Sequence, residues 1–383
     1  MLKFGAKRSA AETSDTAEKS DKKKLTLKQK TLIALGAVLL FFVMIVATVY
    51  GTFLHYYNKM NITSVGDNDE IVTAVDYEDD DLNTKDLTDE ERRKLEELMK
   101  QANGEDDGTE LFNVDDKNVT NILLVGTDSR KKGNRRSRTD SMIILSIDKK
   151  NERITMTSVL RDSYVNIPGV GKNRLNAAFV FGGPNLLFKT FDENFDIHLN
   201  RYVQIDFFNF VDLIDTVGGV DIALTPDEIK IMNKSYIPYI NYCMKKKEKS
   251  NLIKKTKDET YHLNGVQALA YSRIRYVGNA DFGRTERQRK VLTQIIKKTK
   301  KMSVSELNKL ADILLPMFST NLTQGEVMSL LLNAKEYLNY DIVSGRMPID
   351  GSYKYMTIRG ASVLGVDFSA NKKYWYQLVY GEK

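Results

Sequence analysis

Charged residues gather at the ends of three apolar runs, in a pattern suited to metal-assisted phosphate chemistry. The runs are rich in β-branched residues, which is typical of buried strands: Ile122–Val125, Met142–Ile147 and Ile154–Val159. The charged residues that flank them are Asp128, Arg130, Arg138, Asp140, Arg161 and Asp162. Carboxylate oxygens hold a hard cation such as Mg²⁺, and planar guanidinium groups bind phosphate oxygens in pairs. One Asp beside one Arg is usually a surface ion pair, but adjacent strands can bring this whole set into one crevice.

A second charged cluster follows further along the chain. Residues 265–272 are expected to form a helix, and Arg273 and Arg275 come directly after it. If that segment is extended, these two arginines point to the same face. The chain is expected to be helical again from Arg284, which places Gln288 one turn later on the same face. The sequence has no GxxxxGK[ST] phosphate loop and no GxSxG motif, so nucleotide hydrolysis and α/β-hydrolase chemistry lack support.

The elements that must position these clusters alternate between strands and helices. Expected helices cover 174–181, 185–194, 207–217, 303–318 and 324–338, and expected strands cover 202–205 and 220–224. This alternation predicts an α/β layered fold. The tail beyond 338 is expected to be mixed and partly β, ending at 374–380. The phenylalanine-rich middle of the chain is interpreted as core, with a lining for an alkyl chain as the alternative.

An uncharged segment of 24 residues, Thr31–Leu54, predicts a transmembrane helix. A helix of this length crosses a hydrocarbon core of about 30 Å. The long apolar run ends in an aromatic belt, which favours a retained anchor over a cleaved signal peptide. Basic residues before it and acidic residues after it place the N-terminus in the cytoplasm and everything from Tyr56 onward outside. We therefore expect a single-pass membrane protein without a nucleic-acid partner.

The net charge of +6 is distributed unevenly along four expected parts of the chain. A cytoplasmic tail, 1–30, carries nine basic and four acidic residues, and the transmembrane helix, 31–54, carries none. Residues 55–117 carry seven basic and twenty acidic residues. We interpret this region as a solvated spacer or, alternatively, as a small accessory region. Within it, a helix is expected from Thr88 through Gln101. The functional domain, 118–383, carries 41 basic and 27 acidic residues, which predicts an anionic partner.

Cysteine and histidine usage limits the metal chemistry. A lone Cys243 excludes an internal disulfide and a cysteine-based metal cluster. The three histidines are His55, His198 and His262, and no HExxH pattern occurs. We expect all three histidines to be structural or solvated, so zinc chemistry is not supported.

Seven motifs in this order resemble the LytR-CpsA-Psr family of cell-wall glycopolymer ligases. They are GTDSR, RTDSM, LRDS, RLNAAFVFGG, VDLIDTVGGVDI, LNGVQALAYSRIR and DFGRTERQRKVL. The resemblance covers about residues 118–383 together with the single N-terminal anchor. One position departs from the family pattern, because Leu160 stands where the family usually has proline before the Arg-Asp pair. The acidic region 58–117 has no counterpart that can be carried over.

The resemblance implies an exported enzyme with an α/β/α fold around a mixed sheet, in a Gram-positive-type bacterium. It would take a glycopolymer, such as teichoic acid or capsular polysaccharide, from an undecaprenyl-pyrophosphate carrier and join it to peptidoglycan through a phosphodiester. Asp128 and Asp140 would coordinate Mg²⁺, with Mn²⁺ as an alternative ion. The residues that would hold the phosphates are Arg138, Arg161, Arg273, Arg275, Arg284 and Gln288.

The resemblance also assigns the remaining parts of the site. The polyprenyl chain would lie in an apolar groove, lined by the 179–217 segment. The base that activates the sugar hydroxyl stays open between Asp128, Asp162 and Asp281, and Asp281 is counted with Arg161, Asp128 and Asp140 among the catalytic candidates. Phosphoryl transfer needs charge neutralisation and in-line placement more than a protein nucleophile, which agrees with these residue types.

Two other functions remain alternatives. A polyprenyl-pyrophosphate phosphatase would employ the same site with water as the acceptor. A non-catalytic regulator or wall-binding scaffold would need no turnover at all. A product covalently joined to peptidoglycan separates the ligase from the phosphatase, and full function of Arg161→Ala or Asp140→Ala in a deletion strain would favour the scaffold.

Overall fold

The computed structural model describes Met44, residues 50–63, Glu90, Arg93, Glu97 and residues 117–128, 137–278 and 280–381. Residues 50–57 are helical, but most of the expected transmembrane helix, 31–54, lies outside the described residues. Within the described part, no helix combines the length and the apolar character needed to cross a membrane. Of the expected helix from Thr88 through Gln101, only Glu90, Arg93 and Glu97 are described, and all three are helical. The chain divides into two compact units, 1–53 and 54–383.

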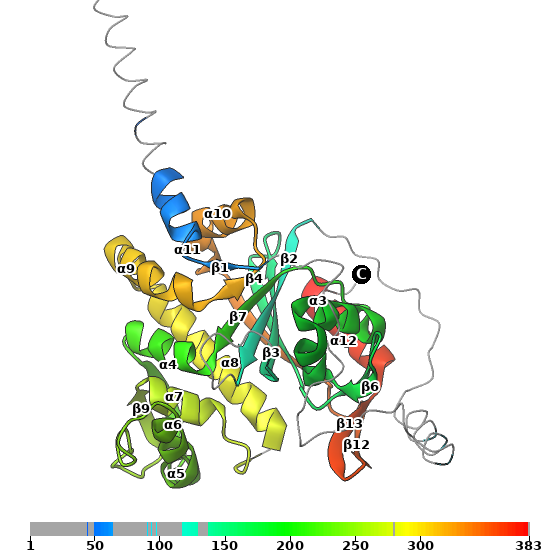
Figure 1. Ribbon diagram of the computed structural model, residues 1–383. Coiled ribbons are helices and arrows are strands. Elements are labelled where there is room, and N and C mark those ends of the chain that lie inside the picture. The colour runs from blue at the N-terminus through cyan, green and yellow to red at the C-terminus, as the bar shows by residue number, and fades with distance from the viewer. Residues whose placement is uncertain are drawn as a thin grey trace, which may run out of the picture. The chain divides into compact units, whose positions relative to one another are not determined.

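A mixed β-sheet of seven described strands organises the second unit (Figure 1). Its order is β1 (Asn61–Ile62), β10 (Ser319–Thr320), β7 (Tyr202–Asp206), β2 (Val119–Thr127), β3 (Thr139–Asp148), β4 (Arg153–Val159) and β11 (Asp341–Met347). The middle strands β2, β3 and β4 form an antiparallel meander. β7 pairs in parallel with β2, and β11 pairs in parallel with β4. The predicted strands at 122–125, 142–147, 154–159 and 202–205 are therefore confirmed, with each strand somewhat longer than its apolar run.

Helices cover both faces of this sheet, which confirms the layered α/β/α fold (Figure 1). One face carries α3 (Leu175–Phe195) and α12 (Phe368–Tyr380), and the other carries α8 (Ala280–Thr299), α10 (Gln324–Leu332) and α11 (Ala334–Tyr337). Side chains alternate between the two faces, so that Met142 and Ile144 join the first core while Ile143 and Ile147 join the second. Burial on both faces explains why these strands read as continuous apolar runs.

Another apolar cluster, separate from the cores on the two faces, lies beside the sheet. It is formed mainly by the segment between β7 and α8 in the sequence. Its elements are α4 (Phe207–Thr216), β8 (Val220–Leu224), α5 (Pro226–Ile231), a π-helical turn (Met232–Tyr236), α6 (Ile237–Cys243), β9 (Glu259–Leu263) and α7 (Gly265–Ser272). β8 pairs only with β9 in a two-stranded ribbon and does not enter the central sheet. Asp206 begins α4, because its side chain accepts a hydrogen bond from the Asn209 backbone N–H at 2.8 Å.

Two more ribbons and a helical segment complete the described fold. The ribbons pair β5 (Tyr164–Ile167) with β6 (Gly171–Arg174), and β12 (Tyr353–Ile358) with β13 (Ala361–Val366). The β12–β13 hairpin is attached beside the end of β4, because the Leu364 backbone N–H donates to the Asp162 carbonyl at 2.9 Å. α9 (Val304–Leu314) and a 3₁₀ turn (Leu315–Met317) lead into β10.

The structure corrects several expected boundaries. The two helices expected around Gly182-Gly183-Pro184 are one element, α3, with non-helical backbone angles at Gly182 and Gly183. The expected helix 324–338 is divided at Asn333 into α10 and α11, and the expected helix 303–318 already ends at Leu314 and continues as the 3₁₀ turn. Arg273 is the C-cap of α7 in helical geometry, so the segment that carries Arg273 and Arg275 is not an extended strand. α8 begins at Ala280, before Arg284.

Gly265 allows α4 and α7 to approach closely, and we predict that Gly265→Ala lowers the free energy of unfolding by about 2–3 kcal/mol. A Cβ at this position would lie 2.2 Å from the Val211 carbonyl oxygen, which is backbone and cannot rotate away. Gly325→Ala is the matched control, because Gly325 also lies in the first turn of a helix and a Cβ there would meet no atom within 4 Å. Urea unfolding of both variants measures the difference, and equal midpoints would contradict the close-packing explanation.

Candidate functional site

The polar ends of three central strands meet at one edge of the sheet. β2 and β3 are antiparallel, so the end of β2 lies beside the start of β3, and the Asp128 backbone N–H donates to the Arg138 carbonyl at 3.3 Å. β4 is antiparallel to β3 and therefore ends at this same edge, with Arg161 and Asp162 just beyond its last residue. The structure thus brings Asp128, Asp140, Arg161 and Asp162 together. Arg130 lies outside the described residues.

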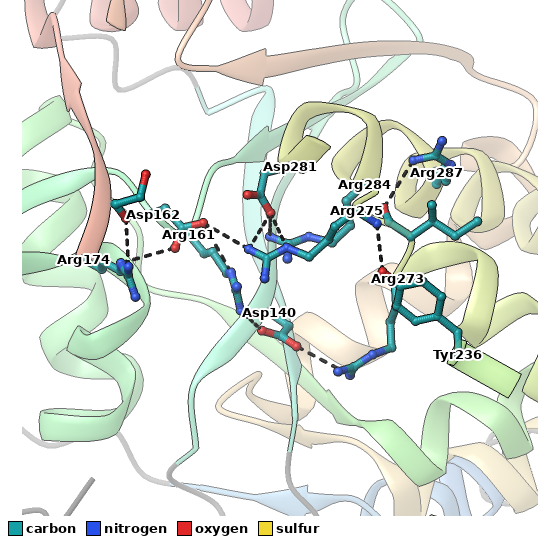
Figure 2. A network of polar contacts seen from close by, with 12 residues as sticks. Asp140, Arg161, Asp162, Arg174, Tyr236, Arg273, Arg275, Asp281, Arg284 and Arg287 are labelled. Atoms are coloured by element: carbon teal, nitrogen blue, oxygen red, sulfur yellow. Dashed lines mark hydrogen bonds and ion pairs between the residues drawn. The ribbon is translucent and has the colours of Figure 1, made fainter. Parts of the chain in front are cut away.

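Arg161 lies at the centre of the charged cluster (Figure 2). Its guanidinium hydrogen-bonds Asp140, and its Nε lies 3.5 Å from a carboxylate oxygen of Asp162. Asp162 also lies 3.5 Å from Arg174 and 3.5 Å from Arg275. The side chain of Asp162 is 14% exposed and that of Arg161 17%, so these charges are mostly removed from water.

Arg273 joins the two carboxylates proposed for the metal. Its guanidinium lies 3.4 Å from Asp128 and 3.5 Å from Asp140. The same group lies 5.0 Å from the centre of the Phe207 ring, at a distance that allows a cation–π contact. Asp128 and Asp140 therefore face one cationic group, and the Arg273 side chain borders an apolar surface.

Arg275 and Arg284 converge on Asp281. Asp281 Oδ1 lies 2.8 Å from Arg275 and 2.9 Å from Arg284, which is three residues later on α8 (Figure 2). Two hydrogen bonds hold the loop that carries Arg273 and Arg275. Arg287 donates to the Ile274 carbonyl, and the Tyr236 hydroxyl accepts from the Arg275 backbone N–H at 3.1 Å.

Arg284 is buried among the other arginines of the cluster, and both its burial and its neighbours affect its pKa. Burial, followed by repulsion from Arg161, lowers the pKa of Arg284 to about 10, although Asp281 acts in the opposite direction. The Arg284 side chain is only 5% exposed, and its Nε is buried without a hydrogen-bond partner among the described residues. An anion placed between these guanidinium groups would relieve the repulsion and accept that unused hydrogen bond.

The two residues at the centre keep their charges. Burial alone would raise the pKa of Asp140, but the positive charges of Arg161 and Arg273 hold that pKa below its ordinary value. Burial alone would lower the pKa of Arg161, but Asp140 and Asp162 hold it above its ordinary value. Both side chains are therefore ionised at neutral pH.

An apolar groove of about 350 Å³ opens next to Asp128, Asp140 and Arg273. Its walls come from β2, β3, β7, α4, α7 and α8, and its apolar lining includes Phe207, Phe210, Leu213, Leu292, Ile295 and Phe318. Gln288 also lines the groove, and its Oε1 is buried without a hydrogen-bond partner among the described residues. The groove thus combines a long apolar wall with a charged end.

Only part of the segment expected to line this groove does so. Residues 203–213 contribute to the wall, but Phe179, Phe188, Phe191 and Phe195 are buried in the core between α3 and the opposite face of the sheet. The expectation for the whole 179–217 segment is therefore wrong for its first half. Residues on α8, namely Leu292 and Ile295, supply wall positions that had been missed.

A smaller pocket of about 210 Å³ lies at the other end of the charged cluster. It is lined by Leu160, Arg161, Asp162, Arg174, Arg275, Asp281, Phe282, Tyr355, Ser362 and Leu364. It shares no lining residue with the apolar groove, and the contact between Asp140 and Arg161 connects the two.

Comparison with known proteins agrees with this arrangement. The sequence matches the LytR_cpsA_psr family over residues 84–379. The chain belongs to the LytR-CpsA-Psr family. It is 32% identical over 254 residues to the regulatory protein MsrR of Staphylococcus aureus (strain COL), covering 66% of this chain and 72% of MsrR. It is also 32% identical over 253 residues to the polyisoprenyl-teichoic acid–peptidoglycan teichoic acid transferase TagU of Bacillus cereus (strain ATCC 14579), covering 64% of this chain and 75% of TagU.

A solved structure, TagT bound to LI-WTA, is similar in fold, with a TM-score of 0.53 and 25% identity. The similarity covers 69% of this chain and 92% of the TagT chain. The LytR-CpsA-Psr match begins at residue 84, upstream of residue 118, where the motif resemblance begins.

The structure gives a reason why this family member accommodates leucine at position 160. The Leu160 side chain is 1% exposed within the core, and its backbone N–H donates to the Met347 carbonyl at 2.9 Å. Proline has no N–H and could not make this hydrogen bond. Leucine therefore adds one link between β4 and β11 and leaves Arg161 in the cluster.

Asp128 and Asp140 have the ligand chemistry that a Mg²⁺ ion would require. Their carboxylates already converge on one cationic group, Arg273, and both line the groove. Mg²⁺ is usually held by one or two carboxylates together with substrate phosphates, so two carboxylates suffice. Among the described residues, the only cluster of three possible metal ligands is Asp192, Asp196 and His198, an exposed group on and after α3.

The sequence missed three residues that contribute to the cluster. Arg174, at the end of β6, pairs with Asp162 and donates to the Ser362 carbonyl at 2.8 Å. Arg287 and Tyr236 hold the 273–275 loop. Arg174 belongs to the RLNAAFVFGG motif, which could have identified it, but Tyr236 has no local signal.

The three histidines, which were expected to be structural or solvated, are all exposed and each lies near a carboxylate. His55 pairs with Asp312, His198 with Asp192, and His262 with Asp221.

Proposed function

We propose that this chain transfers a glycopolymer from a polyprenyl-pyrophosphate carrier to peptidoglycan, forming a phosphodiester bond. The observation that supports this most is the apolar groove that ends at a cluster of arginines and aspartates. A polyprenyl pyrophosphate has the same division, because an apolar chain is followed by a doubly phosphorylated head group. The name of TagU, a transferase for teichoic acid and peptidoglycan, supports the same reaction class.

The polyprenyl chain would lie along the aromatic and aliphatic wall formed by α4, α7 and α8. Its pyrophosphate would lie against Arg161, Arg273, Arg275 and Arg284, with Gln288 at the boundary. Planar guanidinium groups bind phosphate oxygens in pairs, and they stabilise the charge that develops on a leaving phosphate. Arg138 is placed at the same sheet edge by its backbone and would complete the phosphate contacts.

Asp128 and Asp140 would hold a Mg²⁺ ion, which when bound supplies charge neutralisation for the pyrophosphate. The chain's own residues orient the head group and keep it away from bulk water. Asp281 and Asp162 are the carboxylates nearest the smaller pocket, so they are the candidates for the proton of the attacking hydroxyl. Asp128 lies on the groove side, so it is better placed to hold the ion than to receive that proton.

The proposed setting is the outer face of a cell membrane, with the segment 31–54 as a single-pass anchor and the N-terminus in the cytoplasm. Anchoring would raise the local concentration of a lipid-borne donor. The polymer would be a teichoic acid or another anionic wall polysaccharide, since the domain carries 41 basic and 27 acidic residues.

Transfer by the purified full-length chain tests the proposal. The chain in detergent is given a synthetic polyprenyl-pyrophosphate glycan, peptidoglycan oligomers and Mg²⁺, and the products are identified by mass spectrometry. A phosphodiester-linked glycan–peptidoglycan product that disappears with a chelator is expected. Free glycan phosphate and lipid phosphate without a linked product would indicate a phosphatase, and donor binding without turnover would indicate a scaffold.

We expect Arg275→Ala to weaken binding of the lipid pyrophosphate about tenfold without unfolding the domain. The Arg275 side chain is 35% exposed and contacts Asp162 and Asp281, so it is not core material. Titration of the lipid donor measures the affinity, and circular dichroism checks the fold. Equal affinity of the variant and the parent would remove Arg275 from the phosphate-binding set.

A further inference from the structure

The charged cluster separates two cavities of different character. The groove on the α4–α7–α8 side is almost entirely apolar, whereas the smaller pocket is lined by arginine, aspartate and the β12–β13 hairpin. Figure 2 shows Arg161, Asp281 and Arg284 between Arg174 at one end of the network and Arg273 at the other. A head group bound to the cluster would therefore be reachable from two directions.

We propose that the smaller pocket binds the acceptor sugar, the peptidoglycan residue whose hydroxyl receives the glycopolymer. The proposal rests on the proposed transferase function. In phosphoryl transfer the attacking and leaving oxygens lie roughly in line on opposite sides of the phosphorus. With the lipid leaving group on the groove side, the acceptor must approach from the other side of the cluster, and that side is the pocket.

The chemistry of the pocket suits a sugar ring. Its volume of about 210 Å³ accommodates one pyranose. Tyr355 lies on β12 with 65% of its surface exposed, while Met356, the next residue, is buried beneath the hairpin. An exposed aromatic ring beside fixed charges offers a flat surface for the C–H face of a sugar, and the charges offer partners for its hydroxyls.

The rim of the pocket is fixed by the fold, so Tyr355 is held in place. The Tyr355 ring packs edge-on against Tyr353 at 5.8 Å, and Tyr353 lies 4.8 Å from Phe282 on α8. The hairpin is also attached to the charged cluster, since Arg174 donates to the Ser362 carbonyl at 2.8 Å. The pocket is therefore built from five separate parts of the chain: the end of β4, the end of β6, the loop after α7, the start of α8 and the hairpin.

The acceptor hydroxyl oxygen bonds to the phosphorus that carries the glycan, and the bond from that phosphorus to the bridging oxygen breaks. Polyprenyl phosphate leaves with the bonding electron pair. The hydroxyl proton passes to a carboxylate in the pocket, Asp162 or Asp281, and from there to water.

Replacing the ring tests the assignment. Tyr355→Ala is expected to raise the KM for peptidoglycan oligomers about five- to tenfold, with kcat at saturating acceptor within about twofold of the parent. The Kd for the lipid donor should not change. Tyr355→Phe keeps the ring and should restore the parent KM. Tyr242→Ala is the surface control, because Tyr242 is 81% exposed on α6 and lines neither the groove nor the smaller pocket.

Two results would overturn the assignment. An unchanged acceptor KM in Tyr355→Ala would remove the ring from acceptor binding, and a parallel loss of donor affinity would assign the pocket to the first sugar of the donor. Direct binding separates failure of this inference from failure of the proposed function. If the parent chain makes no linked product, titration with N-acetylglucosamine–N-acetylmuramic acid oligomers still decides the pocket: loss of binding in Tyr355→Ala supports it, and equal binding, or no binding by the parent, overturns it.

Discussion

Arg161→Ala should lower kcat/KM for transfer by about a thousandfold or more, because it removes the guanidinium on which the site converges. Arg161 contacts Asp140 on the groove side and Asp162 on the pocket side. Without it, the phosphate loses its central partner, and Asp140 and Asp162 each lose one of their counter-charges. Steady-state transfer assays with a defined lipid donor, followed by mass spectrometry, measure this loss.

Two further variants show whether the loss is specific. Arg153→Ala is the matched control, because Arg153 lies at the opposite end of β4 and pairs with Asp148 at 3.7 Å. It should retain most of the activity. Arg161→Lys keeps the charge but loses the planar pair of donors, so we expect only partial recovery. Full activity in Arg161→Ala would contradict the catalytic role and favour a scaffold.

Asp140→Ala should lower kcat/KM about a hundredfold or more and abolish the dependence of the rate on Mg²⁺ concentration. The Asp140 carboxylate lies between Arg161 and Arg273, so its removal leaves both arginines without a shared partner. We expect the free energy of unfolding to fall by about 1–3 kcal/mol, because these groups are mostly buried. Isothermal titration with Mg²⁺ in the presence of the lipid donor separates ion binding from catalysis.

The pH dependence of stability gives an independent measurement on Asp140. The arginines hold its pKa in the folded chain below its ordinary value, so the folded state favours the charged form. Its contribution to stability is complete above about pH 4, the unfolded pKa, and is lost as the pH falls through the lower folded pKa. Asp140→Asn should therefore weaken the loss of stability as the pH falls below about 4. Identical acid unfolding of the variant and the parent would contradict the ion-pair arrangement.

Local sequence patterns determined the elements and most of the charged residues of the site. Three apolar β-branched runs became β2, β3 and β4, because strands buried on both faces tolerate little else. The limits of α7 were predicted at 265–272 and agree with the structure, since Asn264 and Gln267 form a capping box at its start. The charged residues of the site were also predictable, because they stand directly after strands and helices. Where the chain leaves the core, a charged side chain must either reach water or pair with an opposite charge.

Tertiary structure alone decided which surfaces these residues share. The helices α3 and α4 are both rich in phenylalanine and aliphatic residues. However, α3 packs against the sheet, whereas α4 lines the groove. Periodicity reports which residues are apolar and cannot report which partner covers them. Tyr355 carries no distinctive local pattern, and the attachment of β13 beside Asp162 brings its hairpin to the charged cluster. Arg174 belongs to a motif, but the backbone hydrogen bond from Leu175 to the Ser163 carbonyl is what places it beside Asp162. Long-range contacts between strands depend on the whole chain. They therefore determine where the two cavities lie relative to the charged residues that the sequence predicts.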